Sequence, residues 1–217
     1  MRSIPLAALA HSIWIGSLLG IWGALVIANA SGAIEPCMPF WDGCASISKV
    51  GRSWPAIVWF KVVSVACIVC LVLFWMRTAE QLKRGGLAVL GLIAGGFLLI
   101  YIIALGIDGT LYRWMRRFGI YFFFVGLLIA QCWTTRLLHR RGCGSRSLNA
   151  CAIGILAVGF SALPAFALVE DDDWLENLFE WWLALLMYGW FGLLARTLPW
   201  DDMPAGCDTH DAHDAHD

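Results

Sequence analysis

Three arginines, Arg113, Arg116 and Arg117, lie close together in DGTLYRWMRRFG, residues 108–119, which joins two long apolar runs. Their i, i+3, i+4 spacing places them on one face if the segment is helical. The planar guanidinium group of arginine can bind two oxygens of a phosphate or carboxylate at once. Because ionisable groups near a membrane usually pair or face a cavity, we expect this face to meet an anion.

An acidic stripe occurs in EDDDWLENLFEWW, residues 170–182. On a helix its polar members are spaced i, i+3, i+4, i+7 and share one face: Asp173, Glu176, Asn177 and Glu180. We expect this stripe and the arginines to begin two membrane spans on the same side of the membrane. The prediction is that the acidic stripe pairs with the arginines.

Two interpretations of this pairing remain open, and they are compatible. In the first, the pairs only staple helices together. In the second, they line an outward-facing polar pocket for a lipid headgroup. The candidate headgroup-binding residues come from the arginine cluster and from an adjacent loop: Arg113, Arg116, Arg117, Arg52, Ser46 and Ser48.

Catalysis is the weaker alternative for the same region. A carboxylate that is partly buried at the top of a bundle can serve as a general base, and the weak candidates are Glu176, Glu180 and Asp108. No histidine is predicted on this side. His11 lies in the first span, where we expect it to be hydrogen-bonded within the bundle. The balance leans towards a protein that is not an enzyme.

The C-terminal stretch alternates histidine with aspartate, and His210, His213 and His216 are weak candidates for binding Zn²⁺ or Ni²⁺. Its low complexity favours a disordered cytoplasmic tail over residues 200–217. We predict no resident metal and no cofactor. The two signs of charge are segregated along the chain, and no basic surface for nucleic acid is expected.

The elements that position these residues are predicted from composition. Of the 217 residues, 60% are hydrophobic and 14% are charged, and 13 are tryptophan; a soluble domain carries about 25% charged residues. A span of the hydrocarbon core takes roughly 20 helical residues. Six segments are long enough: 4–30, 56–76, 87–107, 119–138, 149–169 and 180–198. The sequence therefore predicts an all-α polytopic membrane protein, with six transmembrane helices in one bundle over residues 1–199.

The orientation follows from the basic residues. Nine of the 15 lysines and arginines fall on the side of the termini, and positive residues favour the cytoplasm. Both termini are thus predicted to be cytoplasmic, and the loop over residues 31–55 to be outside. The first segment could also be a signal peptide, since Arg2 precedes it. Its apolar stretch exceeds the 7–15 residues of such peptides, so an uncleaved helix is preferred.

The outer loop contains Cys37 and Cys44, seven residues apart. Disulfides persist outside the cytoplasm, so a bridge between them is predicted, with two free thiols as the alternative. Ser46-Ile47-Ser48, then Gly51, then Pro55 entering an apolar segment, resembles the outer-loop signature of the Frag/DRAM/Sfk family of six-span membrane proteins.

That family includes damage-regulated autophagy modulators, yeast Sfk proteins and GPI-lipid remodelling factors. The resemblance continues in Asp108-Gly109, in the Arg116–Gly119 entry to the fourth span and in the Glu176–Trp181 entry to the sixth. The chain departs from eukaryotic members at Lys49 and Ala56, where they often carry acids. The resemblance implies a bacterial-type member with six spans and a role in lipid handling.

We therefore expect an inner-membrane protein of a bacterium that recognises, remodels or regulates lipids. Membrane lipids are its expected partners. One alternative is a structural or regulatory subunit that docks on another membrane protein. A small transporter is less favoured, because the second, third and fifth spans carry no charge at mid-membrane and no inverted repeat is visible.

Overall fold

The computed structural model describes residues 4–168 and 173–197, and every regular element in this part of the chain is an α-helix. Two helices are short: α2 (Pro39–Asp42) and α3 (Ile47–Arg52). The others are α1 (Leu6–Ala30), α4 (Ala56–Leu82), α5 (Gly85–Ala104), α6 (Thr110–Arg140), α7 (Arg146–Leu168) and α8 (Asp173–Thr197). The predicted all-α class is confirmed.

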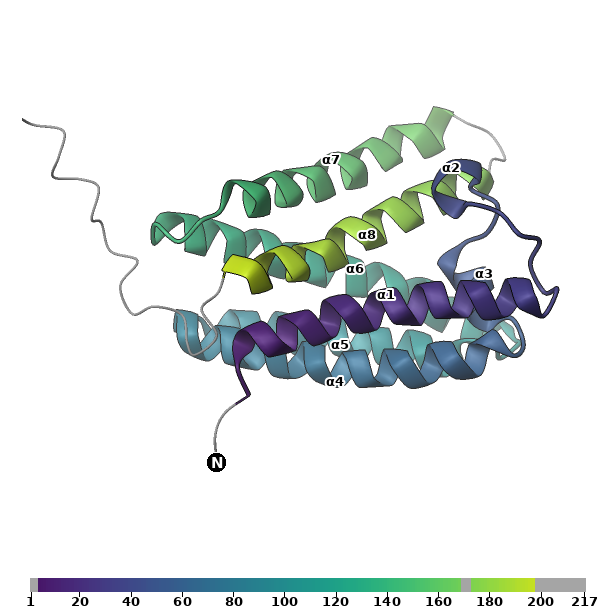
Figure 1. The fold of residues 1–217 in the computed structure, drawn as a ribbon, viewed down its shortest axis with the longest axis horizontal. Helices are drawn as coiled ribbons and strands as arrows, with labels where there is room; N and C mark the ends of the chain where they lie inside the picture. The colour runs from purple at the N-terminus through teal and green to yellow at the C-terminus, as the bar shows by residue number, and fades with distance from the viewer. Residues whose placement is uncertain (1–3, 169–172, 198–217) are drawn as a thin grey trace, which may run out of the picture.

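The long helices run side by side along the longest axis, and α2 and α3 lie together at one end (Figure 1). We call residues 31–55, which contain these two short helices, the cap. The end of the bundle that carries the cap is the cap end, and the opposite end is the tail end. Helix α1 begins and α8 ends at the tail end (Figure 1). Because α1 runs from the tail end to the cap end, the cap follows directly after this helix in the chain (Figure 1).

Five helices are long and apolar enough to cross a membrane: α1, α4, α5, α6 and α8. Helix α7 has a shorter apolar stretch over Arg146–Ser161 within the described residues. Large aliphatic side chains such as Val62 and Ile153 face outwards, each 66% exposed, as expected where lipid is the solvent. The fold is therefore that of an integral membrane protein. A sixth crossing by α7 remains a prediction.

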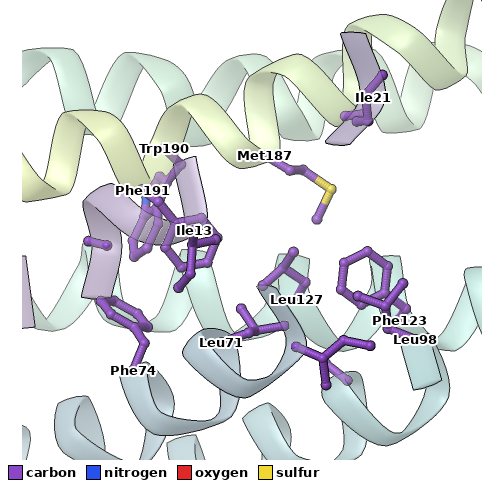
Figure 2. Packing of buried hydrophobic residues seen from close by; sticks show 14 of the residues in the cluster. Ile13, Ile21, Leu71, Phe74, Leu98, Phe123, Leu127, Met187, Trp190 and Phe191 are labelled. Carbon is purple, nitrogen blue, oxygen red and sulfur yellow. The ribbon is translucent and has the colours of Figure 1, made fainter. Parts of the chain in front are cut away.

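The core is formed where side chains from five of the long helices meet (Figure 2). The labelled members are Ile13 and Ile21 of α1, Leu71 and Phe74 of α4, Leu98 of α5, Phe123 and Leu127 of α6, and Met187, Trp190 and Phe191 of α8. The ring of Trp75 stacks on that of Trp190 with their centroids 6.1 Å apart. Helix α8 is thus held against α4 by aromatic contacts.

Small residues allow α1 and α4 to approach closely, as is common between helices in lipid. The indole Nε1 of Trp59 donates a hydrogen bond to the Leu19 carbonyl across this interface, at 3.0 Å. A Cβ atom at Gly23 would collide with that indole, and Gly16 and Gly20 also lie against α4 side chains. The glycine spacing on α1 therefore serves packing.

A buried polar contact joins α6 to α8 nearer the tail end. The amide Nε2 of Gln131 donates to the Met187 carbonyl at 2.7 Å, and Trp190 Nε1 donates to Thr135 Oγ1 at 2.9 Å. Such bonds contribute about 0.6 kcal/mol on average within a membrane bundle. They fix the rotation of α8, whose other end carries the acidic stripe.

Candidate functional site

The cap is docked on the first turns of α8 by hydrogen bonds to its backbone. Three side chains of α8 donate to cap carbonyls: Asn177 to Gly43 at 2.7 Å, Trp181 to Ala45 at 2.8 Å and Trp182 to Phe40 at 3.1 Å. The Phe40 ring lies 5.4 Å from the ring of Trp181 and 5.3 Å from that of Trp182. Tryptophan combines apolar area with one donor, so two of these residues supply both kinds of contact.

A disulfide bond joins Cys37 to Cys44 and encloses α2. The predicted bridge is thus confirmed. It closes the loop whose Phe40 and Gly43 carbonyls accept from α8. The bridge therefore restrains the segment through which the cap contacts the bundle.

Glu180 has a structural role at the start of α3. Its Oε2 accepts a hydrogen bond from the Ile47 backbone N–H at 3.2 Å, and the Ser48 backbone N–H also interacts with it. Ser46 accepts from the Lys49 N–H at 2.9 Å. The first N–H groups of a helix lack partners within that helix, so Glu180 and Ser46 together satisfy them.

Arg116 is likewise bonded to the backbone. Its Nη1 donates to the carbonyls of Ala104, at 3.1 Å, and Ile107, at 2.7 Å. Ala104 is the last residue of α5, and carbonyls at that end have no partners within the helix. Arg116 therefore fixes the turn between α5 and α6.

This geometry predicts different effects for two neighbouring arginines. Replacing Arg116 by glutamine should lower the free energy of unfolding by about 1.5–3 kcal/mol, because a charged donor is lost from two carbonyls. Arg117, which is exposed, should change it by under about 0.5 kcal/mol on the same replacement. Unfolding curves of the two variants in one detergent test this difference. Equal destabilisation would contradict the capping role of Arg116.

The cap and four long helices, α5, α6, α7 and α8, line a cavity of about 1110 Å³ at the cap end. It is lined by all six residues predicted to bind a headgroup: Ser46, Ser48, Arg52, Arg113, Arg116 and Arg117. The acidic stripe lines it too, with Asp173, Glu176, Asn177 and Glu180. Two stripes some 60 residues apart in sequence therefore face a common space.

Direct ion pairs between these stripes were expected, but none occurs in the described part of the chain. The ion pair found there joins Arg77 to Glu80, 3.1 Å apart near the tail end of α4. Glu180 binds the start of α3, and Arg116 binds the end of α5. Unpaired backbone groups at helix ends compete with oppositely charged residues for the same side chains. Here Glu180 and Arg116 are bonded to the backbone groups instead of to each other's stripe.

The wall of the cavity that is nearer the tail end is apolar. It is formed by Ile120, Phe124 and Val125 of α6, Val158 of α7 and Leu183 of α8. Tyr121 and Val125 line the cavity while 60% and 52% exposed. The cavity therefore has a charged part nearer the cap and an apolar part nearer the tail end, and the apolar part is open at the bundle surface.

A second cavity, of about 50 Å³, lies deeper among α1, α4, α5, α6 and α8. Tyr101 and Glu180 line both cavities. The Tyr101 side chain is 3% exposed, and its hydroxyl has no hydrogen-bond partner in the described structure although Ser48 lies beside it. A buried polar atom without a partner calls for an explanation, such as an absent water or ligand.

The remaining predicted residues lie elsewhere. Asp108 is exposed and does not line the cavity, so the structure does not bring it together with the other two catalytic candidates, Glu176 and Glu180. His210, His213 and His216 lie outside the described residues. Within residues 4–168 and 173–197, no three His, Cys, Asp or Glu side chains are arranged to hold a metal ion.

Sequence reasoning missed part of the lining. Tyr101, Trp114, Tyr121 and Trp174 all line the cavity. Tyr101 could have been selected from the sequence, because it is a polar side chain close to the end of a long apolar run. The others resembled ordinary aromatic residues of a membrane interface.

The fold and the cavity together define a class: an all-helical membrane protein with a capped, charged cavity at one end of its bundle. Comparisons with protein-family models, with curated proteins and with solved structures find no match. Arguments about function therefore depend on the chemistry of this cavity.

Proposed function

We propose that this protein crosses the membrane six times and binds the phosphate of a lipid headgroup in the cap-end cavity. The observation that carries the proposal is the set of basic side chains lining one cavity above an apolar wall. Arg52, Arg113 and Arg117 are exposed, and none forms an ion pair with a described residue. They are therefore available to a ligand, whereas Arg116 is bonded to backbone carbonyls.

A phospholipid fits this division of the cavity. Arginine binds phosphate oxygens in pairs, and the exposed lining residues Tyr121 and Val125 leave a route for acyl chains towards lipid. A free inorganic phosphate would use only the charged part. The apolar wall thus favours a lipid over a soluble anion.

The proposal is tested by replacing Arg113 and Arg117 together with glutamine. We expect the affinity of the purified protein for phospholipid to fall about a hundredfold or more, since two charge-assisted bonds of about 1.5–3 kcal/mol each are lost. Native mass spectrometry in detergent, with added phosphatidylglycerol, measures the bound fraction. Arg84→Gln is the matched control, because Arg84 is exposed at the tail end.

Unchanged phospholipid binding by the double variant would overturn the proposal. An equal loss in Arg84→Gln would also overturn it, because the binding would then not depend on the cavity. Circular dichroism and gel filtration of each variant establish that the fold is retained.

We further propose that the protein is a bacterial-type member of the Frag/DRAM/Sfk family with its cap on the non-cytoplasmic side of the inner membrane. Supporting this, the signature segments that resemble the family are scattered along the chain, yet they lie near one another at the cap end. Ser46 and Arg116 line the same cavity as Asn177. The disulfide in the cap also suits a non-cytoplasmic compartment.

A regulatory subunit that docks on another membrane protein is the second candidate. The observation favouring it is the exposure of two cap tryptophans, Trp41 at 72% and Trp54 at 74%. Tryptophan is enriched in protein interfaces, but it is also enriched where protein meets the membrane surface. Copurification of a partner in stoichiometric amount would favour docking.

A further inference from the structure

The charges that line the cap-end cavity lie on two walls that are formed by different helices. The basic residues belong to α3 and α6: Lys49, Arg52, Arg113, Arg116 and Arg117. The carboxylates of Asp173 and Glu176 belong to α8. Within the described residues, no ion pair joins the two walls. The cavity thus presents a positive side and a negative side to whatever occupies it.

The acids differ in how far they are already engaged. Asp42 accepts from the Met38 N–H at 2.9 Å, and Glu180 binds the start of α3. Asp173 is in the first turn of α8, where a negative charge is favoured by the helix dipole. Glu176 is exposed, lines the cavity and has no hydrogen bond or ion pair to another described side chain. Glu176 is therefore the carboxylate best able to bind a ligand cation.

We propose that the cavity selects a zwitterionic headgroup with a primary ammonium, as in phosphatidylethanolamine, with its phosphate on the α6 arginines and its ammonium on Glu176. This inference rests on the proposed function and specifies the lipid. A primary ammonium offers three N–H donors to carboxylate oxygens. A headgroup that is only anionic would leave Glu176 facing a negative or neutral group.

Tyr101 places a further polar side chain between the two cavities, with Ser48 beside its hydroxyl. This side chain is almost fully buried and lines the cavity, yet its oxygen lacks a partner in the described structure. It lies where Glu180 and the start of α3 meet the α6 wall.

The test measures binding of phosphatidylethanolamine and phosphatidylglycerol, added separately to the delipidated protein, by native mass spectrometry. The wild-type protein should bind phosphatidylethanolamine more tightly. Glu176→Gln should reduce that affinity about tenfold, the order expected for one charge-assisted hydrogen bond, and should leave phosphatidylglycerol binding intact. The matched control is Asp108→Asn, which removes an exposed carboxylate outside the cavity.

The outcomes separate this inference from the proposed function. Equal or tighter binding of phosphatidylglycerol by the wild type would overturn the zwitterion preference but leave phosphate recognition standing. A preference that survives Glu176→Gln, or is lost equally in Asp108→Asn, would overturn the role of Glu176. Binding of neither lipid would overturn both proposals. Retained phosphatidylglycerol binding by the variant shows that its cavity is folded.

Discussion

Gly43→Ala is expected to release the cap from α8 and to lower the free energy of unfolding by roughly 2–5 kcal/mol. Gly43 has φ +55°, and the left-handed region costs a residue with a Cβ about 1–2 kcal/mol. The new Cβ would also collide with the backbone of Trp174, and overpacking typically adds about 1–3 kcal/mol. Thermal unfolding in detergent measures the loss.

The same substitution should weaken lipid binding, because the cap carries Ser46, Ser48 and Arg52 on the cavity wall. If the cap separates from α8, the hydrogen bond from the Trp181 indole N–H to the Ala45 carbonyl is lost, and this N–H should exchange with solvent faster. Hydrogen exchange and phospholipid binding on one preparation therefore report the same event.

Gly32→Ala is the matched control for this prediction. Gly32 also has a positive φ, +72°, and it too lies in the cap, but a Cβ there would meet nothing within 4 Å. Its substitution should cost only the conformational part, about 1–2 kcal/mol, and should leave phospholipid binding unchanged. If the two variants behaved alike, close docking of the cap on Trp174 would be refuted.

The sequence predicted the helical class and the disulfide because both depend on local information. An apolar run of sufficient length has few alternatives in lipid, and Cys37 and Cys44 are near neighbours in the chain. Spacing alone also indicated two sets of charged residues, each on one helix face, and both sets line the cavity. Arg113 and Glu176 were assigned to faces of two helices, and both line it.

The partners of those residues were not predictable in the same way. Glu180 accepts from the Ile47 N–H, which is 133 positions away, and Arg116 donates to the end of α5 instead of to a carboxylate. The pattern of charged residues in the sequence suggests that opposite charges pair. Unsatisfied backbone groups at helix ends cannot be read from that pattern, because every residue carries the same backbone groups. Because Glu180 and Arg116 are engaged in structural bonds, Glu176 and the exposed arginines are left without ion pairs to described residues at the cavity wall.

The cavity is positioned by the packing of the long helices. Gly91→Ala should lower the free energy of unfolding of this helix bundle by about 1–3 kcal/mol, the usual cost of overpacking. Gly91 is buried in α5, where a Cβ would collide with the Cβ and ring of Trp75. Trp75 is itself fully buried and stacks on Trp190 of α8. Because the atom struck is next to the α4 backbone, relief requires α4 and α5 to separate.

Gly96→Ala, five residues further along α5, supplies the comparison. A Cβ at Gly96 would meet nothing within 4 Å, and alanine favours a helix over glycine by up to about 1 kcal/mol in water. This variant should therefore be neutral or slightly stabilised, while Gly91→Ala unfolds at a clearly lower temperature in the same detergent. The difference between them isolates the contact with Trp75, since both replace a glycine within one helix. If Gly91→Ala were as stable as Gly96→Ala, the close α4–α5 packing beneath the cavity would be wrong, and so would the rotation of α5 that directs Tyr101 into it.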